Sequence, residues 1–152
     1  MLIGLIADTH GLIRPPALKV FKGANLILHA GDIGEVSVLE TLKKIAPVTA
    51  VRGNCDRGLW ASQIPETQVV EAAGKFIYLL HQRKKIELDP IAAGFQAVIC
   101  GHSHQPLIEK KPGVIFINPG SAGPRRFKLP VTVGLLRISG QDVEAEIVRI
   151  DS

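Results

Sequence analysis

The chain alternates short apolar runs with short polar loops, and this pattern predicts most of its secondary structure. Runs of five or six residues rich in Ile, Val and Leu are typical of strands buried on both faces. In the first half they lie at residues 2–7, 25–30 and 48–52. Amphipathic segments separate them, so the order strand–helix–strand–helix–strand predicts parallel strands with right-handed crossovers.

Two helices are expected between these strands. The first covers residues 17–22, with two prolines placed to open it and a glycine to end it. The second covers 35–46 and carries apolar residues at helical spacing, with Glu35 near its start and two lysines near its end, as the helix macrodipole prefers. Pro47 then ends the helix.

The second half predicts hairpins rather than crossovers. Residues 68–72 and 76–80 flank a turn at Ala73-Gly74-Lys75, and a short helix is expected near Pro90. Further strands are expected at 97–100, 107–110, 114–117, 131–138 and 143–150. No repeat or linker divides the chain. We therefore expect one domain over residues 1–152, with two packed sheets and helices outside.

Composition adds little to this picture. A chain of 152 residues with 46% hydrophobic and 21% charged residues has ordinary globular composition. Cys55 and Cys100 do not form a disulfide framework, which favours a reducing cytoplasm. The N-terminus begins directly with a strand pattern, without the features of a signal peptide. No apolar stretch approaches the ~20 residues that span a bilayer, so we expect a cytoplasmic protein without a membrane partner.

The net charge of +4 is mild, and its basic clusters lie at residues 83–85, 110–111 and 125–128. Proteins that bind nucleic acids usually concentrate more charge and interleave aromatic residues, which make up only 5% here. We expect solvated faces rather than a nucleic-acid surface. One cluster could steer an anionic substrate.

Side chains able to bind metal ions follow the apolar runs. Two Asp, one Asn and four His lie just after strand ends, at Asp8, His10, Asp32, Asn54, His81, His102 and His104. If those ends share one rim, the seven side chains outline a binuclear metal centre.

The individual motifs differ in strength. Asp8 and His10 are two residues apart on an extended segment, so both can reach one ion, but alone they could be turn residues, as could Asp32 and Asn54. The pair at 102 and 104 is stronger, because two histidines at the end of a buried strand rarely serve packing. For His81 both interpretations stay open. His29 lies inside a strand pattern, where a hydrogen-bonded role behind the site is expected.

The ordered series DTH, GDIG, GNCD, His81, GHSH and NPGS, which begins at Asp8 and ends at Ser121, resembles the calcineurin-like metallophosphoesterase superfamily. More narrowly, it is similar to the small bacterial and archaeal phosphodiesterases that lack a cap domain. The resemblance implies an α/β fold, a four-layer α/β/β/α sandwich of two mixed sheets with two metals at the strand ends.

Carried over to this chain, the resemblance assigns four ligands to each metal. The first metal takes Asp8, His10, Asp32 and His104, and the second takes Asp32, Asn54, His81 and His102. Asp32 bridges the metals, because a carboxylate has two oxygens that can bind two ions. The metals would share a hydroxide that attacks phosphorus, while Asn54 helps to hold the phosphoryl oxygens. Manganese is expected from the resemblance; mixed N and O ligation also suits Fe, Co, Ni or Zn.

The chain departs from the superfamily in two places. The protein phosphatases of the superfamily carry a histidine, thought to assist the leaving group, where this chain has Cys55, a weak proton donor. After His81 a glycine is usual, whereas Gln82-Arg83-Lys84-Lys85 follows here. This segment alters the rim of the second metal site and adds positive charge.

These observations favour an enzyme that hydrolyses small phosphate esters or nucleotide-like diesters. The alternative is a non-catalytic scaffold, because a eukaryotic retromer subunit resembles the family but has degraded metal ligation. All seven ligand positions here carry competent side chains, which favours the enzyme. A purely structural metal protein is disfavoured, since structural sites are usually closed and rich in cysteine. Relatives often self-associate, so a homo-oligomer is one of the two oligomeric states that the sequence allows.

Overall fold

The computed structural model describes residues 1–151, which form two five-stranded sheets. Sheet A has the order β10-β9-β1-β2-β3 and sheet B the order β4-β5-β6-β8-β7. The strands of sheet A are β1 (Leu2–Ile6), β2 (Leu26–His29), β3 (Val48–Ala50), β9 (Thr132–Ser139) and β10 (Asp142–Arg149). Those of sheet B are β4 (Thr67–Ala72), β5 (Lys75–Leu80), β6 (Ala97–Ile99), β7 (Leu107–Lys111) and β8 (Val114–Asn118).

Both sheets are mixed. In sheet A, β1, β2 and β3 are parallel as the crossover pattern predicts, and the hairpin of β9 and β10 adds antiparallel strands beside β1. In sheet B, β5, β6 and β8 are parallel, with β4 and β7 antiparallel at the edges. The carboxyl ends of β1, β2, β3, β5 and β6 lead into the loops that carry the candidate site.

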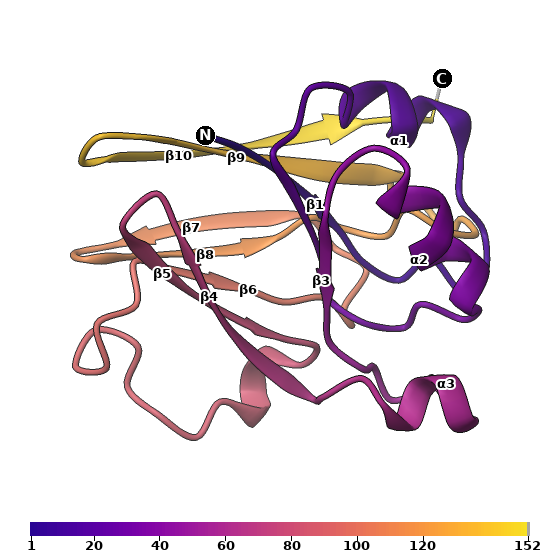
Figure 1. Cartoon of the computed structure of the whole chain (residues 1–152), viewed down its shortest axis with the longest axis horizontal. Coiled ribbons are helices and arrows are strands. Elements are labelled where there is room, and N and C mark those ends of the chain that lie inside the picture. Colours follow the sequence, from indigo (N-terminus) through magenta and orange to yellow (C-terminus); the bar gives the residue numbers. More distant parts are fainter. Residues whose placement is uncertain (152) are drawn as a thin grey trace.

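Three hydrophobic layers hold the sheets and their coverings together. Alternate strand residues such as Ile3, Leu28 and Ile99 pack between the two sheets. The outer face of sheet A packs against α1 (Pro15–Val20) and α2 (Val36–Lys43), and α3 (Leu59–Ser62) lies at the end of the molecule where β3 ends (Figure 1). The outer face of sheet B is covered by the segment 82–96, which contains the 3₁₀ turn η1 (Arg83–Lys85). This layering confirms the expected α/β sandwich of two mixed sheets.

Two local expectations differ from the structure. The helix expected near Pro90 is wrong: Asp89 and Pro90 accept backbone hydrogen bonds from Ala93 and Phe95, and a turn ends at Gly94, whose φ is +86°. A proline and a glycine so close together leave room for one turn only. Conversely, the sequence pattern did not predict the four-residue helix α3, which follows Gly58. So short a helix has no measurable hydrophobic periodicity. Within residues 1–151, no helix is both long and apolar enough to cross a bilayer.

Candidate metal centre

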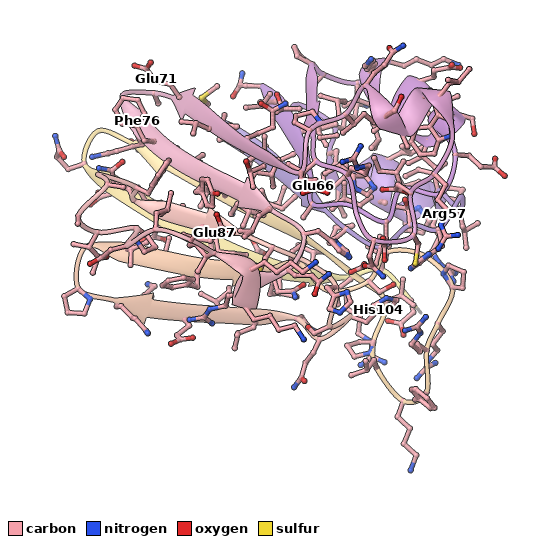
Figure 2. All side chains as sticks on the ribbon, turned by 90° about the horizontal axis from the view of Figure 1, so that it is seen from below. Arg57, Glu66, Glu71, Phe76, Glu87 and His104 are labelled. Carbon is pink, nitrogen blue, oxygen red and sulfur yellow. The ribbon has the colours of Figure 1, made fainter. Side chains whose placement is uncertain are left out.

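The seven predicted ligand residues gather at one end of the molecule. Figure 2 shows His104 at this end, opposite the end where Glu71 and Phe76 mark the tip of the β4–β5 hairpin. Two groups made only of predicted ligands have their ligand atoms within 4.8 Å of one another: the first contains Asp8, His10 and His104, the second Asp32, His81 and His102. The separate strand ends therefore do share one rim.

Asp32 belongs to the second group and also contacts the first. Its Oδ2 is 3.8 Å from Nε2 of His10 in the first group and 3.2 Å from Nε2 of His81 in the second. Asn54 joins the second group, with its Oδ1 3.2 Å from Nδ1 of His102. The same oxygen, Oδ2, thus faces both groups and has lone pairs that could bind two ions, while Oδ1 accepts the backbone N–H of Cys55.

The backbone of the site is strained. Asp8, His10, Asp32, His102 and His104 have φ values of 55°, 47°, 55°, 73° and 64°, in the left-handed region that residues with a Cβ rarely adopt. Such conformations cost on the order of 1–3 kcal/mol each and persist where the surrounding structure holds them, often at functional sites. The pattern of apolar runs carries no signal for this strain.

Hydrogen bonds between the loops hold that strained backbone. The N–H groups of Asp8 and His10 donate to the carbonyls of Gly31 and Asp32, both at 2.9 Å. The loops also approach closely: a Cβ on Gly53 would overlap the Asp32 carboxylate. Only glycine fits there, which explains the glycine before Asn54 in physical terms.

Asp56 is a site residue whose role the sequence pattern did not reveal. Its carboxylate is buried and accepts three backbone N–H groups, from Ile33 at 3.1 Å, Gly34 at 2.9 Å and Gly53 at 2.9 Å. These bonds join the loop that carries Asp32 to the loop that carries Asn54. Asp56 is the last residue of the GNCD motif, and its place there is the sequence feature that could have indicated this role.

His29 is fully buried behind the ligands and takes part in a chain of hydrogen bonds. Its Nδ1 accepts the N–H of Gly31 at 3.1 Å, so its Nε2 carries the proton and donates to Oγ1 of Thr9 at 3.0 Å. The Thr9 hydroxyl in turn donates to the carbonyl of Ile33 at 2.8 Å. Burial, with a smaller contribution from His81, lowers the pKa of His29 to about 3, so the ring is neutral.

His81 is oriented toward the site despite the unusual residues that follow it. Its Nδ1 lies 2.7 Å from the carbonyl oxygen of Ala30, which fixes the proton on Nδ1. Its Nε2 therefore faces the carboxylates of Asp32 and Asp8, at 3.2 and 3.9 Å. A histidine held in this way is typical of a metal ligand supported by a backbone carbonyl.

Ligand atoms that lack partners provide a test for metal binding. Within residues 1–151, the buried side-chain atoms without a hydrogen-bond partner are Asp8 Oδ1, His10 Nε2, His81 Nε2 and His104 Nδ1. All four belong to predicted ligands. Each buried polar atom left unpaired costs about 1–3 kcal/mol, so native proteins keep few of them. The oxygen and imidazole donors fit divalent cations of the first transition series.

The electrostatics of the two carboxylates differ. Burial raises the pKa of Asp8 to about 7, although the nearby His81 charge opposes the rise. Burial also acts to raise the pKa of Asp32, but the His81 imidazole 3.2 Å away and the hydrogen bond from the Cys55 backbone N–H outweigh it, so this pKa lies below its usual range. His81, held by Asp32, has a raised pKa despite its burial. Burial lowers the pKa of His104 to about 4.

Cys55 lies at the exposed edge of the site. Its backbone N–H donates to Oδ1 of Asp32 at 2.9 Å, and its sulfur lies within 4.8 Å of ligand atoms of His10 and Asp32. Burial and the adjacent Asp32 charge raise the pKa of the thiol. It therefore stays protonated at neutral pH, where a thiol is a weak hydrogen-bond donor.

The NPGS loop packs behind the first group of ligands. The Ser121 hydroxyl is buried and donates to the carbonyl of Asp8 at 3.2 Å. The Asn118 amide donates to the carbonyl of Gly101 and to Oγ of Ser103, both at 3.0 Å. Both side chains are thus used to position the loops around residues 8 and 101.

Comparison with known proteins identifies the family of the chain. The family model described as the calcineurin-like phosphoesterase superfamily domain matches residues 1–141. A probable metallophosphoesterase of Methanothermobacter thermautotrophicus is 34% identical over 161 residues, covering 98% of this chain and 92% of the relative.

Two solved structures show the same fold at lower identity. One comes from the structural and functional characterization of a novel archaeal phosphodiesterase; it has a TM-score of 0.79 and 23% identity over 97% of this chain and all of that one. The other is wild-type Vps29 of Entamoeba histolytica complexed with zinc, with a TM-score of 0.77 and 22% identity over 98% and 99% of the two chains.

The chain therefore belongs to the calcineurin-like phosphoesterase superfamily. This is a metal-dependent family, and the two groups of ligand atoms described above are the candidate metal-binding groups of this member.

Proposed function

We propose that this protein is a metal-dependent phosphodiesterase with a binuclear centre. The observation that carries the proposal is the set of four unpaired buried ligand atoms around a carboxylate that touches both groups. The similarity to an archaeal phosphodiesterase supports it. The expected substrate is a small phosphate ester or nucleotide-like diester, and a cytoplasmic location stays a prediction from the two unpaired cysteines.

Each metal position has four proposed ligands. The first is held by Asp8, His10, Asp32 and His104, and the second by Asp32, Asn54, His81 and His102. Manganese is the proposed metal, with Fe, Co, Ni and Zn compatible with the same donors. Two divalent ions bound there would supply a water acidic enough to act as hydroxide at neutral pH and positive charge to stabilise the phosphoryl oxygens.

The protein side chains prepare this chemistry. Asp32 and Asn54 are the proposed catalytic residues, because the carboxylate contacts both groups and the Asn54 amide can donate to a phosphoryl oxygen while its oxygen faces His102. Asp56 and His29 position the loops around them. Cys55 offers only weak help to a leaving alkoxide, so the leaving group departs largely on its own stability.

Diesters are the proposed substrates in preference to monoesters, on the likeness to an archaeal phosphodiesterase. The competing proposal is a non-catalytic scaffold, which the likeness to Vps29 leaves open. The complete set of seven competent ligand side chains favours the enzyme, because a scaffold has no need to keep them together.

The test is hydrolysis of bis(p-nitrophenyl) phosphate by protein stripped with a chelator and reloaded with Mn²⁺. Wild-type protein should recover activity on reloading, and Asp32→Ala should lose at least ~10³-fold of it, because both metals lose a shared ligand. Asp142→Ala, which removes an exposed carboxylate at the start of β10, is the control and should keep full activity. Equal metal-dependent rates for wild type and Asp32→Ala would contradict the proposal.

A further inference from the structure

A cavity of about 380 Å³ opens beside the second group of ligands. It lies on the outer face of sheet B, where β6 and β8 end and β7 begins, and His102 and Gly101 form its inner wall. Its volume falls within the ~300–1,000 Å³ typical of small-molecule sites. A ligand whose phosphate reached His102 could place an attached group at the mouth of this cavity.

The floor of the cavity is apolar because of strand alternation. Phe116 and Asn118 of β8 point to the outer face together, and Leu107 of β7 lies directly opposite Asn118. Cys100, just after β6, completes the floor. Leu107 is 45% exposed, so a large apolar side chain at the entrance stays open to solvent.

The segment that follows His81 builds the opposite wall. Arg83 lies over the Phe116 ring, with its Cζ 4.0 Å from the ring centroid, and its Nη1 forms a 2.7 Å ion pair with Glu109. These two contacts fix the planar guanidinium along the cavity. Lys84 adds a second cation to the lining, which contains no carboxylate. This is the place where the chain departs from the superfamily pattern.

A second cavity, of about 290 Å³, lies on the other side of the same 3₁₀ turn, next to Asn54 and His81. Its lining combines two carboxylates, Glu66 and Glu87, with two cations, Arg52 and Lys85, and Arg52 forms a 3.1 Å ion pair with Glu66. These charges balance, so this cavity offers no net positive charge to an anionic phosphoester. Of the two cavities, the one beside His102 is therefore the better match to the organic part of such a substrate.

We propose that the cavity beside His102 is the subsite for a flat aromatic ester arm, such as an aryl group or a nucleobase, with Arg83 and Leu107 as its specificity-determining residues. The ring would lie against Leu107 and the guanidinium of Arg83, which itself rests on the buried Phe116 ring. The side chains of Gln82, Ser103 and Gln105 line the same cavity and can hydrogen-bond the polar edge of a base. This inference rests on the proposed function, because it takes the phosphate to bind at the metal centre.

The test compares two phosphonates by isothermal titration calorimetry on Mn²⁺-loaded protein. Phenylphosphonate carries a flat ring, whereas methylphosphonate offers the same anion without one. Wild type should bind phenylphosphonate at least ~10-fold more tightly, the order expected for a buried aromatic contact. Leu107→Trp, which fills the cavity from its exposed side, and Arg83→Ala should each remove most of this preference. Neither should change the affinity for methylphosphonate.

Lys85→Ala is the matched control, since it removes a cation from the same turn but on the side of the other cavity. It should leave the preference for phenylphosphonate intact. Manganese content and circular dichroism establish that each variant is folded and loaded. Equal affinity of wild type for the two phosphonates, or a preference that survives Leu107→Trp, would overturn the subsite while leaving the proposed function standing. Failure of both phosphonates to bind loaded protein would instead count against the proposed function.

Discussion

Replacing Asp8 by Asn should make the metal-free protein more stable while abolishing its response to metal. The Asp8 side chain is fully buried, and its Oδ1 has no hydrogen-bond partner among residues 1–151. Burial raises its pKa from 3.8 to about 7, a thousandfold change in acid dissociation that corresponds to about 4 kcal/mol against the ionised folded form. Since Asn must still bury an amide N–H, at about 1–3 kcal/mol, the net gain expected above pH 7 is about 1–3 kcal/mol.

The sign of the effect changes with pH in a defined window. Between the unfolded pKa of ~3.9 and the folded pKa of about 7, folded Asp8 binds more protons than unfolded Asp8, so its contribution to stability falls as the pH rises. Asp8→Asn should therefore destabilise the protein near pH 4 by about the 1–3 kcal/mol that the buried amide costs, and stabilise it by the full net amount above pH 7. His81 and Asp32 also titrate, which is why the difference between variant and wild type is the quantity to follow.

The assay is urea unfolding in the presence of a chelator, at about pH 5 and at about pH 8. These two pH values lie below and above the pKa of Asp8 in the folded protein. Adding Mn²⁺ should reverse the order: wild type gains about 2.7 kcal/mol at a free ion concentration of 100 Kd, and Asp8→Asn gains little. A metal-free variant that is less stable than wild type at both pH values would refute the reasoning. That result would mean that contacts within the protein stabilise the ionised Asp8 carboxylate, so that it needs no bound cation.

Two further substitutions test the supporting residues. Asp56→Asn should destabilise the protein by about 2–4 kcal/mol and weaken Mn²⁺ binding, because an amide cannot accept all three backbone N–H groups. Thermal unfolding and metal titration measure these two effects. An unchanged metal affinity would show that the two loops hold their positions without the Asp56 carboxylate. Cys55→Ser should alter turnover of aryl phosphodiesters by less than ~10-fold, with the rate rising as the leaving phenol becomes more acidic in both proteins. A wild-type rate that is insensitive to phenol acidity, with sensitivity appearing only in Cys55→Ser, would identify the thiol as a general acid.

Much of the fold could be predicted because buried parallel strands leave continuous apolar runs. The strands that end before Asp8, Asp32 and His102 were recognisable in this way, and the polar residues after them indicated the site. The hairpin at residues 72–75 was equally clear, since its turn residues are local. The helix near Pro90 failed because proline can open a helix or an isolated turn, and the close glycine decides which one forms.

Other features of the site depend on contacts between distant segments. The three N–H groups that donate to Asp56 come from two loops, at residues 33–34 and at residue 53, so no local sequence pattern reveals that they meet at one carboxylate. The positive φ values of Asp8 and His104 are imposed by neighbouring loops rather than by residue type. Likewise, the stacking of Arg83 on Phe116 joins a loop to a strand more than 30 residues away. The sequence indicated the basic segment, but only the packing shows the cavity beside it.

The central claim is that seven side chains bind two divalent ions that together support phosphodiester hydrolysis. The most direct measurement titrates Mn²⁺ into chelator-stripped protein and follows the bound metal and the hydrolysis of bis(p-nitrophenyl) phosphate in the same samples. Because Asp32 contacts both groups of ligands, activity should stay low until the second site fills and reach its maximum at about two ions per chain. Full activity at one ion per chain, with no further binding, would contradict the binuclear account.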